Sequence, residues 1–394
     1  MQTENFGAEL KRLGFSDFAG VPCSYLAPLI NWAINENSFI MANNEGEAVA
    51  IASGISLSSL CNKSQNFGVV LMQNSGLSNA LSPLTSLNHT FNIPILGFVS
   101  LRGEPNELGQ NTDEPQHELL GKITDKLLQT CEIECAFLDS NFEVACEQLA
   151  HAKAVLKSNK SFFFIVRNNC FEKVALKNNP LNLSFKNTTQ AFLSTPSQDK
   201  PTRLQALQII QNLGQNCALL ATTGKCGREL YELGDKENQL YMVGSMGCVS
   251  ALGLGVALKS HKKIIAIDGD SALLMRLGTL AGNAYYAKLA NKGNFCHILL
   301  DNQSHDSTGG QFNLSPFVDF VAIAKSCGYE VAKKAKNLDE FSEILGEFLK
   351  AQNGGAYFIY LDIAKGSKKD LGRPKITPKQ VAQRFSAWLN NKEV

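Results

Sequence analysis

Short apolar runs that stop at polar turns recur along this sequence. They span residues 67–72, 93–99, 162–166, 264–267 and 295–300. Continuous apolar runs of about four to eight residues are typical of parallel strands that are covered on both faces. Stretches with apolar residues at helical spacing separate these runs, and one of them extends from residue 271 to about residue 290. The alternation of strands and helices predicts an α/β fold with parallel sheets.

The same pattern fades between two halves of the chain. Residues 167–201 are rich in Asn, Ser, Thr and Pro and show no regular apolar spacing. Stretches of this composition are typical of linkers. The chain of 394 residues also exceeds the size, about 250–300 residues, at which one hydrophobic core stops growing. We therefore expect an N-terminal domain at residues 1–170, a linker at 171–200 and a C-terminal domain at 201–394.

Charge and cysteine content narrow the possible classes of function. The chain has 37 basic and 36 acidic residues and a formal net charge of +1, so it offers no overall field for nucleic acid or an anionic membrane. It has no apolar stretch of membrane-spanning length, and its first residues lack the features of a signal peptide. The cysteines form no Cys-x-x-Cys motif, and buried free thiols are the simplest account of them. We expect a cytoplasmic protein that acts on a small molecule.

Two polar turns follow neighbouring strands in the second half. The strand at 264–267 leads into Gly269-Asp270-Ser271, and the strand at 295–300 ends at Asp301-Asn302. A strand–helix–strand crossover is right-handed in nearly all proteins, so both turns should lie at the same edge of the sheet. A carboxylate and a carboxamide that converge beside a helix N-terminus suit Mg²⁺ bridging to a phosphate. Such turns also occur in many other α/β proteins, so this pattern alone leaves the function open.

Two further stretches carry candidate chemistry. Glu45 begins a predicted helix after a strand at 38–41, a position where the helix dipole alone favours an acidic residue. A glycine-rich run at 244–255 follows another strand, but its glycines do not form the Gly-x-Gly-x-x-Gly fingerprint of dinucleotide binding. A non-catalytic or NAD-binding α/β protein is the less favoured alternative, because it would leave Glu45, Asp270 and Asn302 unexplained as a set.

The stretch from residue 264 to residue 311 resembles the cofactor motif of the thiamine diphosphate enzymes. That motif has Gly-Asp-Gly, a long interval and then Asn-Asn. In this chain Gly269 and Asp270 match, Ser271 stands for the last Gly, and Asp301-Asn302 stands for Asn-Asn. The resemblance implies a Mg²⁺ ion held by Asp270, Asn302 and the backbone carbonyl of Ser304.

Other residues take their roles from the same resemblance. Glu45, with Asn44 before it and Gly54 after it, matches the position that hydrogen-bonds the aminopyrimidine ring of thiamine diphosphate. The Gly244 carbonyl would accept a hydrogen bond from the 4′-amine, and Met246 would be the apolar wedge that bends the cofactor. The remaining implied cofactor contacts are Thr223, Gly224, Ser245, Gly269, Ser271 and Ala272.

Six patches narrow the family. They are GVPCSYL, NNEGEAVAIASG, QNSGLSNALSPLTSL, RGEP with DEPQH, ILLDNQSHDSTGGQ and GSKKDLGRPKITP. Together they are similar to the phosphonopyruvate decarboxylases, and several are shared with the sulfopyruvate decarboxylases. The resemblance implies two three-layer α/β/α domains with parallel sheets and no middle domain. It also implies a homodimer or larger homo-oligomer, with active sites between the pyrimidine-binding N-terminal domain of one chain and the diphosphate- and Mg-binding C-terminal domain of another.

The implied activity is that of a carboxy-lyase. Such an enzyme would use thiamine diphosphate and Mg²⁺ to convert 3-phosphonopyruvate into phosphonoacetaldehyde and CO₂, in phosphonate biosynthesis of the 2-aminoethylphosphonate type. Sulfopyruvate, or another small 3-anionic 2-keto acid, is the alternative substrate. His117 and His305 are the candidate acids, because an imidazole gives up and recovers a proton near neutral pH. A loop histidine in water is the competing interpretation for each.

The anionic end of such a substrate needs charge-assisted donors. Arg102 and Lys225 lie nearest to the matched patches, and the basic tail at 368–373 is a further possibility. Each could instead be an ordinary surface charge. The neutral candidates are Ser24, Ser75 and Gly76.

Overall fold

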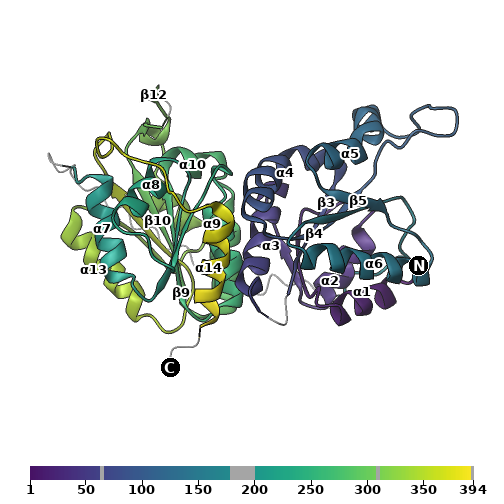
Figure 1. The fold of residues 1–394 in the computed structure, drawn as a ribbon, viewed down its shortest axis with the longest axis horizontal. Coiled ribbons are helices and arrows are strands. Elements are labelled where there is room, and N and C mark those ends of the chain that lie inside the picture. Colours follow the sequence, from purple (N-terminus) through teal and green to yellow (C-terminus); the bar gives the residue numbers. More distant parts are fainter. Residues whose placement is uncertain (63–65, 178–199, 308–310, 392–394) are drawn as a thin grey trace. The chain divides into compact units, whose positions relative to one another are not determined.

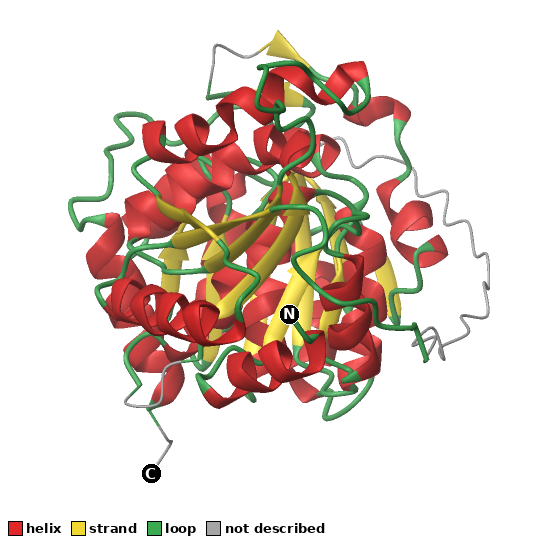
Figure 2. Ribbon diagram, turned by 90° about the vertical axis from the view of Figure 1, so that its right-hand side faces the viewer, coloured by secondary structure: helices red, strands yellow, loops and turns green. Residues whose placement is uncertain are grey.

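The chain forms two compact units, Met1–Asn182 and Leu183–Val394 (Figure 1). A computed structural model describes residues 1–62, 66–177, 200–307 and 311–391. In both units strands run through the interior and helices lie outside them (Figure 2). Each unit contains one six-stranded parallel sheet, which confirms the predicted fold class.

The first unit alternates strands and helices. Its strands are β1 (Asp17–Gly20), β2 (Phe39–Met41), β3 (Gly68–Gln73), β4 (Leu96–Ser100), β5 (Glu134–Phe137) and β6 (Phe162–Val166). Its helices are α1 (Thr3–Arg12), α2 (Ala27–Asn35), α3 (Glu45–Ser59), α4 (Leu77–Pro83), α5 (Glu118–Thr130) and α6 (Phe142–Lys157). Shorter helical turns are η1 (Asn74–Gly76), η2 (Leu84–His89) and η3 (Pro115–His117). The sheet order is β2-β1-β3-β4-β6-β5.

The second unit repeats this arrangement. Its main strands are β7 (Cys217–Ala221), β8 (Gln239–Tyr241), β9 (Lys263–Gly269), β10 (Phe295–Asp301), β13 (Val331–Ala335) and β14 (Tyr357–Asp362). Its helices are α7 (Arg203–Leu213), α8 (Lys225–Glu232), α9 (Val249–Lys259), α10 (Asp270–Met275), α11 (Thr279–Ala290), α12 (Phe320–Ser326), α13 (Leu338–Lys350) and α14 (Pro378–Asn390), with the short turn η4 (Ser315–Phe317). The order β8-β7-β9-β10-β14-β13 follows the same sequence of crossovers as the first sheet. A two-stranded hairpin, β11 (Ser304–His305) with β12 (Gln311–Phe312), follows β10.

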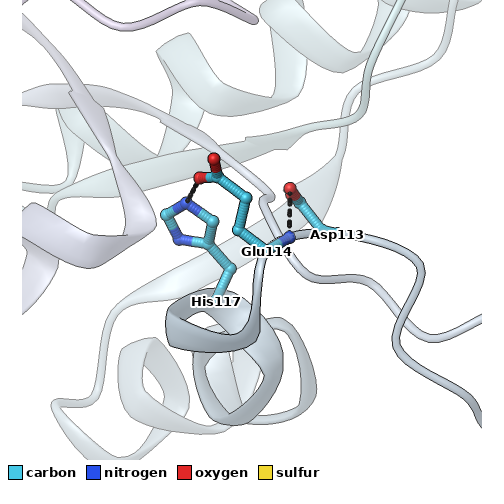
Figure 3. Close-up of side chains that lie close together, drawn as sticks. All are labelled: Asp113, Glu114 and His117. Carbon is cyan, nitrogen blue, oxygen red and sulfur yellow. Dashed lines mark hydrogen bonds and ion pairs between the residues drawn. The ribbon is translucent and has the colours of Figure 1, made fainter.

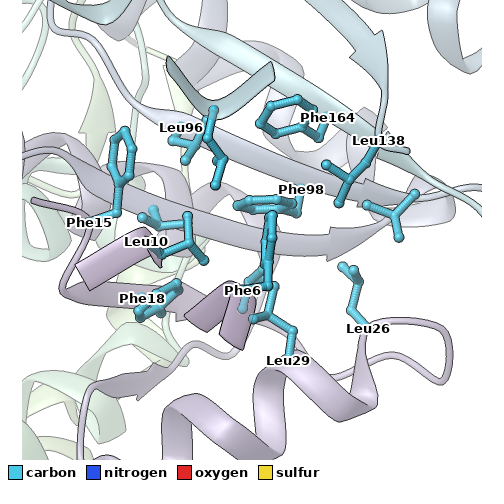
Figure 4. Packing of buried hydrophobic residues seen from close by; sticks show 14 of the residues in the cluster. Phe6, Leu10, Phe15, Phe18, Leu26, Leu29, Leu96, Phe98, Leu138 and Phe164 are labelled. Carbon is cyan, nitrogen blue, oxygen red and sulfur yellow. The ribbon is translucent and has the colours of Figure 1, made fainter. Parts of the chain in front are cut away.

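The continuous apolar runs are strands buried on both faces. In the first unit Phe98 of β4 stacks on Phe164 of β6, with ring centroids 5.3 Å apart, and Phe6 of α1 meets Phe98 edge-on. Figure 4 shows this core between the sheet and the helices. Phe163 and Ile165 alternate with these positions along β6 and are also buried, on the opposite face. Full burial of one such side chain stabilises the fold by about 1.5–3 kcal/mol.

The crossover that brings the two polar turns together is confirmed. Strands β9 and β10 pair in parallel, with Gly269 opposite Leu300. Both strands therefore end at the same edge of the sheet, and the turns that follow them are neighbours.

The helix expected at residues 271–290 is instead two helices. Helix α10 ends at Met275, and Arg276 leaves the helical region with φ −138° and ψ 47°. Gly278 then precedes α11. Gly278 keeps a helical backbone, with φ −60° and ψ −21°, so the departure is made at Arg276, and apolar spacing alone does not locate such a break.

Most of the expected linker lies outside the described residues, which stop at 177 and resume at 200. Its first residue, Phe171, is buried in the core of the first unit. Among the helices that the structure describes, none has both the length and the apolar character needed to cross a membrane.

Candidate active site

The predicted site residues all lie at or beyond the carboxyl ends of strands. Ligands of open parallel sheets bind at this edge, in the crevice where the direction of the crossovers reverses. That reversal falls between β1 and β3 in the first unit and between β7 and β9 in the second. Ser24 follows β1, Asn44 and Glu45 follow β2, Ser75 and Gly76 follow β3, and Arg102 and His117 follow β4. In the second unit Thr223–Lys225 follow β7, 244–246 follow β8, 269–272 end and follow β9, and Asn302, Ser304 and His305 follow β10.

Glu45 is held at the start of α3. Asn44 caps this helix by accepting a hydrogen bond from the Glu47 backbone N–H at 3.0 Å, which accounts for an Asn at this position. Asn79 donates its side-chain amide to Glu45 Oε2 at 2.9 Å. The other carboxylate oxygen lies against Gly76, because a Cβ at residue 76 would come 2.0 Å from Glu45 Oε1. The structure therefore brings Glu45 and Gly76 together.

Arg102 is already paired with a carboxylate. Its Nε and Nη2 donate to the two oxygens of Asp113, both at 2.5 Å. These hydrogen bonds hold the pKa of Asp113 well below its usual range and raise the pKa of Arg102. The remaining nitrogen, Nη1, faces Ser24 Oγ at 3.5 Å, and the guanidinium lies over the Tyr25 ring. Arg102, Ser24 and Asp113 thus form one cluster. No role was predicted for Asp113 from the sequence.

Asn74 fixes the backbone of Arg102. Its side-chain oxygen accepts from the Arg102 N–H at 3.3 Å, and its amide donates to the Arg102 carbonyl at 2.9 Å and to Thr124 Oγ1 at 3.2 Å. No role was predicted for Asn74 from the sequence, although its place in a Gly/Ser/Asn turn after an apolar run is a usable signal.

His117 is buried beside an exposed carboxylate. Its Nε2 lies 3.5 Å from Glu114 Oε2, and Figure 3 shows its other ring nitrogen turned away from Glu114. That nitrogen, Nδ1, has no hydrogen-bond partner among the residues that the structure describes. The ligand atoms of Asp113, Glu114 and His117 lie within 4.8 Å of one another. We assign no metal to them, because the Arg102 guanidinium already supplies the positive charge at Asp113.

Glu45 and Arg102 both lie near the thiol of Cys23. Burial raises the pKa of the Cys23 thiol, and the charges of Arg102 and Glu45 both act on it. The carboxyl edge of the first sheet therefore combines an acid, a cation and a buried histidine.

In the second unit, unusual backbone conformations mark the turns after β7 and β8. Gly224, Gly244 and Gly247 have φ of 93°, 73° and 87°, and Ser245 has φ 46° although it is not a glycine. The Gly244 N–H donates to Thr223 Oγ1 at 3.1 Å, which ties the two turns together. Left-handed conformations in non-glycine residues cluster at functional sites.

Asp270 is oriented by hydrogen bonds on both oxygens. Oδ1 accepts from the Ser271 N–H at 2.6 Å and from Ser271 Oγ at 3.2 Å, and Oδ2 accepts from the Gln303 N–H at 2.7 Å. Ser271 lies in α10 with a helical backbone, so this position does not require glycine. Asn313 donates to Ser271 Oγ at 2.7 Å, a contact that the sequence did not indicate.

The residues after β9 and β10 fit a hard divalent cation and a diphosphate. Asp270, Asn302 and Ser304 are buried and offer oxygen atoms, as Mg²⁺ prefers. Burial, with the hydrogen bond and charge of Asp270, raises the pKa of Asp301, and a nearby cation would relieve this crowding of carboxylates. A Cβ added at Gly269 would meet no described atom within 4 Å, so the backbone there faces open space.

The other predicted residues are Lys225, Met246, His305 and Ser75. Lys225 is half-buried at the start of α8 and forms no ion pair with a residue that the structure describes. Met246 and His305 are half-buried, the latter in the hairpin strand β11. Ser75 accepts a hydrogen bond from Gln73 Nε2 at 2.6 Å.

Two domain families match this chain. Residues 4–122 match the N-terminal TPP binding domain of thiamine pyrophosphate enzymes, and residues 222–361 match their C-terminal TPP binding domain. The solved structure of a thiamine diphosphate-dependent 4-hydroxybenzoylformate decarboxylase from Rhodococcus jostii RHA1 shares the fold, with a TM-score of 0.66 and 10% identity over 93% of this chain and 99% of that chain.

Curated relatives extend over nearly the whole chain. A phosphonopyruvate decarboxylase from Streptomyces viridochromogenes is 38% identical over 97% of this chain and 93% of its own length. One from Streptomyces hygroscopicus is 38% identical over 96% and 91%. A sulfopyruvate decarboxylase from Methanosarcina acetivorans is 27% identical over 98% and 96%. The chain therefore belongs to the thiamine pyrophosphate enzymes and, among them, to the phosphonopyruvate decarboxylase family.

Proposed function

We propose that this protein decarboxylates 3-phosphonopyruvate to phosphonoacetaldehyde and CO₂ with thiamine diphosphate and Mg²⁺. The observation that carries the proposal is the full-length likeness to the phosphonopyruvate decarboxylases. The sulfopyruvate decarboxylase that spans the whole chain is less similar, so sulfopyruvate is the second candidate substrate. The reaction would serve phosphonate biosynthesis.

The second unit would hold the diphosphate end of the cofactor. Bound thiamine diphosphate supplies a nucleophilic carbon and an electron sink for the pair released when CO₂ leaves. Asp270, Asn302 and the Ser304 carbonyl are the proposed Mg²⁺ ligands, and their burial supports this because it strengthens charge–charge attraction. The proposed contacts beyond the metal ligands are Thr223, Gly224, Gly244, Ser245, Met246, Gly269, Ser271 and Ala272.

Glu45 would hold a proton for the pyrimidine ring. Its Oε2 already accepts from Asn79, so the proton belongs on Oε1, which lies beside Gly76. In this account the cofactor's ring nitrogen receives a hydrogen bond from Glu45 Oε1. The absence of a Cβ at Gly76 keeps that oxygen accessible.

His117 is our favoured acid for the product, with His305 as the alternative. The buried Nδ1 of His117 lacks a partner among described residues, and a buried ring nitrogen without a partner is costly unless a ligand supplies one. Glu114 at Nε2 would stabilise the protonated ring. A proton on the imidazole would then be available for transfer to the carbon that has lost CO₂.

The substrate's anionic end would meet Arg102 and Ser24. Asp113 occupies two of the guanidinium nitrogens and leaves Nη1 beside Ser24 Oγ. An N–H and an O–H side by side suit a phosphonate oxygen. Lys225 is the second proposed cation, and Ser75 and Gly76 are further proposed donors.

We also propose that the active protein is a homodimer or larger homo-oligomer. The first unit carries Glu45 and Arg102 but not the Mg²⁺ ligands, and the second unit carries the Mg²⁺ ligands but no counterpart of Glu45 in its matched motif. Both sets must act on one cofactor, and we propose that they come from different chains. We propose that the reaction takes place in the cytoplasm, and the eleven free cysteines support this.

Cofactor analysis and product detection test the proposal. Native mass spectrometry of the purified protein with thiamine diphosphate and Mg²⁺ should show bound cofactor. Incubation with 3-phosphonopyruvate should then release CO₂ and phosphonoacetaldehyde in equal amounts. Bound cofactor without either product would reject the substrate, and no cofactor binding would reject the enzyme class.

A further inference from the structure

Asp306 lies beside the proposed metal ligand Asn302, outside the residues that the cofactor motif names. Its Oδ2 accepts a hydrogen bond from Asn302 Nδ2 at 2.5 Å. The same oxygen accepts from Arg203 Nη2 at 2.9 Å and from the Gly366 N–H at 3.1 Å. Three donors from separate parts of the second unit therefore converge on one carboxylate oxygen.

This contact decides which way the Asn302 side chain faces. An ionised carboxylate only accepts hydrogen bonds, whereas a carboxamide has a donor end and an acceptor end. The NH₂ group of Asn302 must therefore face Asp306, because the reverse orientation would place two oxygens together. Asn302 Oδ1 then points away from Asp306, where it accepts from the Ser304 N–H at 3.2 Å and keeps a second lone pair.

Asp306 is itself fixed. Arg203 begins α7, and its side chain is 8% exposed. Its Nη1 lies 3.5 Å from Glu229 Oε2, so Arg203 stands between two carboxylates. Glu229 also accepts from the Lys368 N–H at 2.8 Å, but it makes no hydrogen bond with Asn302 among the contacts of the described residues. Glu229 is thus a matched carboxylate that shares the arginine without touching the proposed ligand.

We propose that Asp306 is a positioning residue that locks the Asn302 amide with its oxygen directed toward the Mg²⁺ site. This inference rests on the Mg²⁺ site of the proposed function. Groups that orient metal ligands in this way affect metal affinity by about 10- to 100-fold when they are removed. The hydrogen bond that holds the Asn302 amide in this orientation requires an acceptor oxygen on residue 306.

The experiment measures metal binding directly. Mn²⁺ replaces Mg²⁺, and free Mn²⁺ is followed by electron paramagnetic resonance while the full-length protein is titrated in saturating thiamine diphosphate. Asp306→Ala should weaken Mn²⁺ binding by about 10- to 100-fold. The Mn²⁺ affinity of Asp306→Asn should stay within a few-fold of that of the parent. Arg203 and Gly366 donate to the amide oxygen of the new side chain and so keep this oxygen facing Asn302.

Glu229→Gln is the matched control. It removes a charge from the Arg203 pair and is expected to lower the melting temperature without changing Mn²⁺ affinity. If Asp306→Ala is not folded by circular dichroism, Asp306→Ser takes its place, because the serine hydroxyl is too short to reach Asn302.

The outcomes separate this inference from the proposed function. Parent-like Mn²⁺ affinity in Asp306→Ala, with binding lost in Asp270→Ala, would overturn the positioning role and leave the metal site standing. Equal losses in Asp306→Ala and Glu229→Gln would also overturn it, because the effect would then be structural. Parent-like affinity in Asp270→Ala would remove the proposed Mg²⁺ site, and the role of Asp306 with it.

Discussion

Glu45 and Glu47 lie two residues apart at the start of one helix, yet their surroundings differ. Glu47 is fully buried and accepts from the Asn43 backbone N–H at 2.9 Å and from its side-chain amide. These bonds join Glu47 to the turn that precedes α3. Glu45 is half-buried. Among the hydrogen bonds given for the described residues, only its Oε2 accepts one, from the Asn79 side-chain amide. Glu45 is therefore the carboxyl that is available to a ligand.

We predict that Glu45→Gln binds thiamine diphosphate but fails to activate it. A glutamine accepts and donates hydrogen bonds, yet it has no carboxyl proton to give the pyrimidine ring. Loss of general acid–base help should slow exchange of the cofactor's C2 proton by about 10²- to 10⁴-fold. Exchange with deuterium is followed by NMR. Parent-rate exchange in the variant would remove Glu45 from the mechanism.

The contribution of Asp113 to the free energy of unfolding should be lost at low pH. Its folded pKa lies below the reference value of 3.8, so the ionised form is favoured by folding. That contribution is present above pH about 4 and is lost as the pH falls through the folded pKa. Asp113→Asn should lower the free energy of unfolding by about 1.5–3 kcal/mol.

Urea unfolding of the parent and of Asp113→Asn checks this at several pH values. The difference between the two proteins should be constant from about pH 5 to pH 8 and should shrink below about pH 4. If the difference in unfolding free energy between the two proteins grows as the pH falls, the Arg102–Asp113 pair does not cause that difference.

At the scale of elements, the turn between β3 and α4 makes room for Glu45. A Cβ at Gly76 would lie 2.0 Å from Glu45 Oε1 and 2.2 Å from its Cδ. Gly76 has φ −86°, so the backbone does not need glycine. We predict that Gly76→Ala folds but displaces the Glu45 carboxylate and lowers kcat/KM by about 10-fold or more.

Gly346→Ala is the control for that change. A Cβ at residue 346 meets no described atom within 4 Å, and the residue lies inside α13, where alanine is favoured by about 0.5–1 kcal/mol. Its activity should equal that of the parent. Steady-state kinetics that find both variants alike would show that Gly76 is not a spacer for Glu45.

Some of these elements and contacts could be predicted from the sequence, and others could not. Asp270 and Asn302 could be placed together because two apolar strands and a right-handed crossover fix one edge of the sheet. Strand β5 has no fully buried position and β13 reads Val-Ala-Lys-Lys-Ala, so neither gave an apolar run. Asp306 could not be assigned, because its partner Arg203 is 103 residues away in the sequence.

At the scale of the whole molecule, two sheets of one topology carry complementary residues. We predict that Glu45→Gln and Asp270→Ala chains, each inactive alone, regain part of the activity when mixed under subunit exchange. A heterodimer of this kind has one site in which both residues are intact. Native mass spectrometry reports exchange, and CO₂ release reports activity. Proven exchange without any activity would exclude a site shared between chains.

The preference for a phosphonate substrate can be measured in one kinetic comparison. The values of kcat/KM for 3-phosphonopyruvate and 3-sulfopyruvate are measured by CO₂ release with saturating thiamine diphosphate and Mg²⁺. A phosphonate dianion carries two negative charges on its three oxygens and a sulfonate carries only one, so a cationic donor binds the phosphonate more strongly; a charge-assisted hydrogen bond contributes about 1.5–3 kcal/mol. We predict that kcat/KM is higher for 3-phosphonopyruvate by about 10-fold or more. An equal or higher kcat/KM for sulfopyruvate would contradict it.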